Sequence, residues 1–208
     1  MNKWFYAVIA LLIIGIVSGF FLWKIMVSPQ YSLQQLDKAI TEHDIMTFNK
    51  YVSLDAVIDN IIVQGWQYYT PKQENSGSLW SEFHQEIRNS LLSVVKPNLK
   101  EIIKKEVLDY VTTGRWTNPE TEDKNKISSL IIRMIKEKID PGQWDHQSIN
   151  YAKIEEQTAN IGLTYYDQTN ETNFLLEVRM RNMKGYWQII EIINSTQLLN
   201  TFQNIDSI

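Results

Sequence analysis

The chain has 208 residues, of which 24 are acidic and 20 basic, and it contains no cysteine. At 44% apolar and 21% charged residues it is too hydrophobic for a disordered chain, and it has too little glycine and proline for a fibrous one. The lack of cysteine excludes a disulfide scaffold, a thiolate metal site and a cysteine nucleophile. A formal net charge of −4 argues against nucleic-acid binding driven by bulk charge, so we expect no nucleic-acid partner.

The first predicted element is an apolar segment over residues 4–23, which contains no charged side chain and no side-chain amide. A helix of this length rises about 1.5 Å per residue and covers roughly 30 Å, the thickness of the bilayer hydrocarbon. Lys3 and Lys24 flank the segment, and tryptophan and tyrosine lie near its ends, where they favour the headgroup level. We therefore expect residues 1–28 to be a transmembrane anchor that contacts the lipid bilayer through residues 4–23.

A cleaved secretory signal and a buried core helix are the two alternatives for this segment. The apolar run is longer than the usual ~7–15 residues of a signal peptide, and no small-residue cleavage motif follows it. Residues 1–28 hold two of the 20 basic residues and none of the 24 acidic ones, so the remainder has 18 basic residues and a net charge of −6. An acidic body is easier to place away from the anionic cytoplasmic leaflet, so we expect it on the extracytoplasmic side of the cell membrane.

Gly15 and Gly19 form a G-x-x-x-G pair within the apolar segment. Such a pair lets two membrane helices approach closely, which makes it a candidate face for a homodimer. Glycine is also common in membrane helices for other reasons, so the pair alone does not decide the oligomeric state.

Residues 29–208 are predicted to form one α+β domain, with a helical part at 29–142 and a sheet part at 143–208. Ser32 and Gln35 have the spacing of a capping box and predict the start of the first body helix. Asp44 is expected to cap a short second helix, and Ser53 to begin a third. Loops are expected at 70–78 and 112–125, and a sixth helix at 126–139 before a turn at 140–142. Between the loops we expect a helix that Pro97 breaks or kinks, followed by a further helix.

After residue 142 the apolar pattern changes from helical spacing to alternation. Strands are predicted at 150–156, 161–165, 174–180 and 186–193, with a tight reversal at Lys184 and Gly185. The short connections indicate an antiparallel meander. Ser195 is expected to cap a short terminal helix.

Two stretches of the body resemble a known group of proteins. The opening reads S-L-Q-Q-L at 32–36, A-I at 39–40, H-D at 43–44 and K-Y-V at 50–52. It resembles the opening of an uncharacterised bacterial family of membrane-tethered proteins, and residues 186–194 resemble the last strand of that family. This strand is also similar to the final strand of nuclear-transport-factor-2-like cone domains, in which a curved sheet wraps around helices and leaves an apolar pocket. The resemblance implies a tethered α+β domain and transfers no catalytic residue.

Catalytic patterns are scarce in this sequence. His43, His84 and His146 are the only histidines, and none has the spacing of a zinc-binding helix. No nucleophile elbow, phosphate-binding loop, dinucleotide fingerprint or calcium loop is present. We therefore expect no enzyme activity, cofactor or metal site, with an envelope hydrolase as an alternative.

Trp116 and Trp144 fall in predicted polar loops, which makes them the candidates for stacking on a sugar or a protein partner. The other tryptophans of the body fit a core role. The favoured interpretation is a single-pass membrane protein of a bacterial envelope whose outer domain binds a partner or an apolar ligand without catalysis. The other alternative is an assembly subunit of an envelope or secretion machine.

Overall fold

The computed structural model of the chain describes residues 3–69, 79–116 and 143–204. Its helices are α1 (Lys3–Met26), α2 (Pro29–Thr41), α3 (Ile45–Tyr51), α4 (Leu54–Tyr69), α5 (Leu79–Thr113) and α7 (Ser195–Asn204). Its strands are β1 (Trp144–Glu155), β2 (Thr158–Asp167), β3 (Thr172–Asn182) and β4 (Trp187–Ile192). The predicted α+β class, with helices before the sheet, is confirmed. The predictions at 70–78, 117–139 and 140–142 lie outside the described residues.

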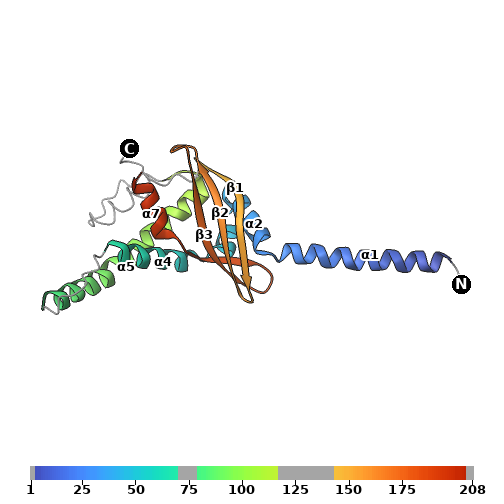
Figure 1. Cartoon of the computed structure of the whole chain (residues 1–208), viewed down its shortest axis with the longest axis horizontal. Coiled ribbons are helices and arrows are strands. Elements are labelled where there is room, and N and C mark those ends of the chain that lie inside the picture. Colours follow the sequence, from blue (N-terminus) through green and yellow to red (C-terminus); the bar gives the residue numbers. More distant parts are fainter. Residues whose placement is uncertain (1–2, 70–78, 117–142, 205–208) are drawn as a thin grey trace.

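Helix α1 extends away from the rest of the molecule and contacts it only at its carboxyl end (Figure 1). From Leu11 onward its described apolar side chains are exposed: Leu11 is 69% exposed, Ile16 71% and Trp23 60%. Among the residues whose side chains the structure describes, which in α1 begin at Leu11, no single helix is both long and apolar enough to cross a membrane. The requirements of length and apolar composition are met only by a pair of helices taken together, Leu11–Met26 and Pro29–Thr41, which are bent by 60° relative to each other.

Helix α2 starts one turn earlier than the capping box predicted. Ser28 is its N-cap, and the Ser28 side chain accepts a hydrogen bond from the backbone amide of Tyr31. The expected capping pair of Ser32 and Gln35 is wrong, because the Ser32 hydroxyl is buried and accepts the backbone N–H of Trp187 instead. The Ser32 side chain therefore bonds to a residue that is distant in the sequence and does not cap the helix.

The next two helices begin where the sequence predicts. The Asp44 carboxylate accepts hydrogen bonds from the amides of Met46 and Thr47, which satisfies two of the free donors of the first turn of α3. Helix α4 follows, with the Val57 amide bonded to the Ser53 carbonyl. Both local predictions are confirmed.

Pro97 does not separate two helices, because α5 is one helix of 35 residues with this proline inside it. The predicted break is wrong. An internal proline costs a helix about 3 kcal/mol through the lost hydrogen bond and the ring clash. Tertiary contacts on both sides of Pro97 oppose this cost: Leu99 is buried, and Lys96 and Lys100 both bind Asp59 of α4.

The four strands form one antiparallel sheet in the order β1-β2-β3-β4, as the meander predicts. Lys184 and Gly185 have positive φ angles of 58° and 151° in the β3–β4 turn, so the predicted reversal is confirmed. β1 begins at Trp144, earlier than the predicted start at residue 150, and its pairing with β2 contains two register shifts. These shifts disrupt the alternation on which the sequence prediction depended.

The core lies between one face of the sheet and the helices (Figure 1). The sheet contributes fully buried side chains at Ile161, Val178 and Met180. The helices contribute the apolar side chains of Ala39, Phe48, Val57, Ile58, Ile62, Leu99 and Val111. Burial of this apolar surface is the main force that holds the helices on the sheet.

The segment between α3 and α4 covers part of the β4 edge. Val52 forms a parallel bridge with Ile189, and the Ser53 amide donates to the Ile189 carbonyl at 2.8 Å. The Asn60 side chain of α4 donates to the Ile190 carbonyl at 3.4 Å. β4 is therefore held by the chain that follows α3 as well as by β3.

Candidate functional site: the junction of the N-terminal helix and the sheet

Trp187 connects β4 to α1 and α2 through partners that lie more than 150 positions earlier in the sequence. Its indole Nε1 donates to the Val27 carbonyl at the end of α1 at 2.8 Å, and its backbone amide donates to Ser32 Oγ of α2 at 2.9 Å. Carbonyl groups at the end of a helix have no partner within the helix, so the indole supplies a missing donor. Trp187 is only 4% exposed; its amide hydrogen bond is buried and its indole hydrogen bond is partly buried. The junction therefore fixes the end of α1 to the first residue of β4.

The β3–β4 turn just before Trp187 is closed by its own hydrogen bonds. The Met183 amide donates to the Tyr186 carbonyl at 2.8 Å, and the Lys184 amide donates to Asn182 Oδ1 at 2.9 Å. These bonds satisfy backbone groups while Met183, Lys184 and Gly185 remain exposed. Because the turn precedes Trp187 directly, it lies next to the base of α1 (Figure 1).

Lys50 of α3 lies against the same end of the sheet. Its ammonium nitrogen is 5.1 Å from the centre of the Tyr51 ring and 5.0 Å from that of the Tyr186 ring. The two rings meet edge to face with centroids 5.7 Å apart. A cation over two aromatic faces is attracted by both, so this contact joins α3 to the β3–β4 turn.

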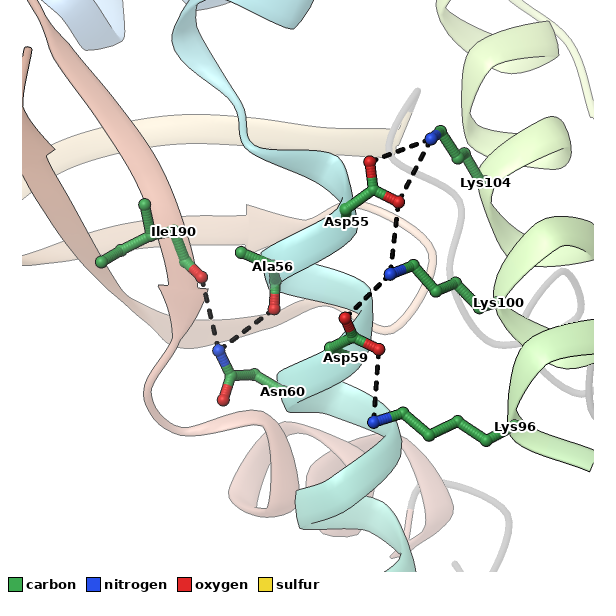
Figure 2. A network of polar contacts seen from close by, with 8 residues as sticks. All are labelled: Asp55, Ala56, Asp59, Asn60, Lys96, Lys100, Lys104 and Ile190. Carbon is green, nitrogen blue, oxygen red and sulfur yellow. Dashed lines mark hydrogen bonds and ion pairs between the residues drawn. The ribbon is translucent and has the colours of Figure 1, made fainter. Parts of the chain in front are cut away.

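A second polar cluster joins α4 to α5, as Figure 2 shows. Asp59 binds Lys96 at 3.3 Å and Lys100 at 2.8 Å, and Asp55 binds Lys100 at 3.3 Å and Lys104 at 2.9 Å. Hydrogen bonds from Lys104 and Lys100 lower the pKa of Asp55, and one from Lys100 is the main cause of the lowered pKa of Asp59. Every charged group in this lysine–aspartate ladder has an opposite partner, which indicates a role in helix packing.

The lysine–aspartate ladder has a sequence signal that the sequence analysis missed. Both aspartates and all three lysines recur at intervals of four residues, which places each set on one side of its helix. No comparable signal exists for the Trp187 junction, because its partners are more than 150 positions away in the sequence.

The face of the sheet opposite the core has further polar contacts. The Tyr151 hydroxyl donates to Glu177 Oε1 at 2.5 Å, and this bond and partial burial raise the pKa of Tyr151 to about 12. The Tyr151 ring covers Gly162 so closely that a Cβ there would meet it at 2.5 Å. Arg179 pairs with Glu191 at 2.6 Å. These side chains bond to one another across neighbouring strands, as expected of contacts that stabilise a sheet.

The structure places the two predicted stacking residues on separate elements. Trp116 follows α5 and packs on Tyr110, with ring centroids 4.7 Å apart. Trp144 lies in β1, where a loop was predicted, and packs on Phe174 at 4.9 Å and near Tyr165 at 6.3 Å. Their proposed role in stacking on a ligand stays a prediction.

The described histidines lie in different surroundings. His43 Nδ1 is 2.9 Å from the Val111 carbonyl, and the His146 ring meets the Tyr165 ring at 5.4 Å. The side chain of His84 lies outside the described residues. Within the part of the chain that the structure describes, no group of three or more His, Asp or Glu residues could hold a metal ion.

Gly15 and Gly19 lie on α1 with open space around them. A Cβ added at either glycine would meet no atom within 4 Å. Their predicted face is therefore available for contact with another helix, and the dimer stays a prediction.

Comparisons of the chain with protein-family models, with curated proteins and with solved structures found no match. The resemblance to the bacterial membrane-tethered family and to cone domains therefore stays a prediction as well.

Proposed function

We propose that this protein is a single-pass membrane protein whose α+β body is a non-enzymatic interaction domain on the extracytoplasmic side. The observation that carries the proposal is the contrast within α1: its described apolar side chains, from Leu11 onward, are exposed, while its carboxyl end is bonded to the body. Water disfavours such a surface, whereas bilayer hydrocarbon accommodates it.

The dimensions of α1 support this role. Its 24 residues rise about 1.5 Å each and cover roughly 36 Å, more than the ~30 Å of bilayer hydrocarbon. Residues 4–23 carry no charge, and Lys24 follows directly. The Lys24 ammonium nitrogen is 5.2 Å from the centre of the Phe20 ring, one turn back along the helix, so the two side chains pair at this end of the apolar segment.

The charge of the body supports its proposed placement and role. Residues 29–208 have a net charge of −6, which disfavours the anionic cytoplasmic leaflet. The polar clusters described above consist of groups bonded to one another, as in the pairing of Arg179 with Glu191. Such clusters stabilise the fold, which agrees with a structural and not a catalytic use of these charges.

Membrane extraction of the full chain tests the anchor. Wild-type protein is expected to remain in the membrane pellet after alkaline carbonate treatment. Ile14→Arg places a charge near the middle of the segment at a cost of about 2.5–3.5 kcal/mol, and part of the protein should move to the soluble fraction. Ile14→Ala is the matched control and should stay in the pellet. Recovery of the intact wild-type chain in the soluble fraction would contradict the proposal.

Reporter fusions at the carboxyl end test the orientation. A reporter that is active only outside the cytoplasm is expected to be active, and one that works only inside the cytoplasm to be silent. The opposite pattern would place the body in the cytoplasm.

A further inference from the structure

The β3–β4 turn has a fixed position relative to α1. Trp187 follows this turn directly and bonds to the Val27 carbonyl, one residue beyond the end of α1. If α1 crosses a bilayer, Val27 lies at the boundary between hydrocarbon and headgroups. The turn residues Met183–Tyr186 are at most four residues from Trp187, so they lie within roughly 14 Å of its backbone, given at most about 3.3–3.6 Å per residue of chain, and therefore near that boundary.

The composition of this end of the body fits a membrane interface. Met183 is 40% exposed, and Lys184 is exposed at the tip of the turn. Lys50 lies beside them, with its ammonium over the Tyr186 ring. Exposed apolar side chains, lysines and tyrosines together are typical of segments that lie in the headgroup layer.

We propose that the β3–β4 turn and Lys50 form a second membrane contact, in which Met183 lies at the edge of the hydrocarbon and the two lysines meet lipid phosphates. The inference rests on the proposed anchoring role of α1. The neighbouring β1–β2 turn contributes Glu155 and Glu156 nearby, and the Asn182 amide donates to its Gln157 carbonyl at 2.9 Å. Because both signs of charge are present, phosphocholine headgroups are sufficient partners and anionic lipid is not required.

Site-directed fluorescence on the full chain tests this contact. The chain has no cysteine, so Ile14→Cys, Met183→Cys and Thr169→Cys each give a single labelling position. Thr169 is exposed in the β2–β3 turn, at the other end of the sheet and about 30 Å away along β3. Each labelled protein is reconstituted in phosphatidylcholine vesicles that carry a nitroxide either on the headgroup or on the acyl chain.

The expected result is loss of fluorescence at position 14 with acyl-chain nitroxide, loss at 183 with headgroup nitroxide, and no loss at 169. If the label at 14 is not quenched, the anchor itself is wrong. If 14 is quenched and 183 behaves like 169, the anchor stands and the second contact is overturned. A label at 183 that is shielded from a water-soluble quencher yet insensitive to both lipids would also overturn it, since this result indicates a protein contact.

Discussion

Helices α1 and α5 are both long, yet their surroundings are opposite. α1 exposes its apolar side chains, with Leu12 61% exposed, and is bonded to the body at its end through Val27. α5 packs Leu99 and Val111 into the core and binds α4 through three lysines. The same secondary structure is thus stabilised in one case by tertiary packing and in the other, as we propose, by lipid.

The largest difference between α1 and α5 is expected in the free energy of unfolding when a leucine of each helix is replaced by alanine. Leu99→Ala on α5 should lower the free energy of unfolding of the body by about 2–5 kcal/mol, because it removes buried methyl groups and leaves a cavity. Leu12→Ala on α1 should leave that free energy unchanged, because Leu12 touches no core. Urea unfolding of the full chain in detergent micelles measures both values. Equal losses in the two variants would show that α1 packs against the body.

The junction of α1 with the body is expected to give the next largest effect. Trp187→Phe removes the indole donor to Val27 and should cost about 1–3 kcal/mol, since a carbonyl loses its partner. The distance between spin labels at Leu22→Cys and Thr169→Cys should become more widely distributed, because α1 is no longer held. Trp144→Phe removes an indole from β1 and is the control; an equal broadening there would contradict the role of Trp187.

The lysine–aspartate ladder between α4 and α5 should contribute less. Lys100→Met keeps the aliphatic stem but removes the cation that bridges Asp55 and Asp59. The expected loss is about 1 kcal/mol or less, because partly exposed ion pairs are weak, and high salt should reduce it. Lys38→Met breaks only the exposed pair with Glu42 and should cost less still. A loss that does not depend on salt would indicate packing instead of charge.

Lowering the pH should also remove the stabilisation that the ion pairs of Asp59 provide, and this is the smallest change in unfolding free energy that we expect. Contacts with Lys100 and Lys96 hold the pKa of Asp59 below its ordinary 3.8. A carboxyl whose pKa is lower in the folded than in the unfolded chain stabilises the fold at pH values above the unfolded-state pKa. This stabilisation is lost as the pH falls through the folded-state pKa. The difference in unfolding free energy between wild type and Asp59→Asn should therefore be constant near neutral pH and shrink below about pH 4. A difference that persists in strong acid would contradict this.

Sequence reasoning succeeded where the structure depends on neighbouring residues. Asp44 caps α3 with amides two and three positions away, and Lys184 with Gly185 forms a turn between adjacent strands. Both features depend on local geometry that a short segment contains in full.

The failures arise from distant contacts. Ser32 has the sequence pattern of a helix cap, but it accepts a hydrogen bond from Trp187. A tertiary contact thus determines the role of this side chain, and the local pattern does not. Pro97 resembles a break, but the burial of Leu99, together with ion pairs from Lys96 and Lys100 to Asp59, supports one continuous helix. The Trp187 junction could not be predicted for the same reason, since its partners come together only after the whole body has folded.

The connection between α1 and the body has a consequence for the interaction role that we propose. Only Val27 and Ser28 separate α1 from α2, and the Ser28 amide still bonds back to the Ile25 carbonyl. The body therefore has no flexible tether to α1. If α1 crosses a bilayer, as we propose, the domain is held at the lipid surface, and a partner would have to approach to within one domain height of that surface and would always meet the same side of the domain.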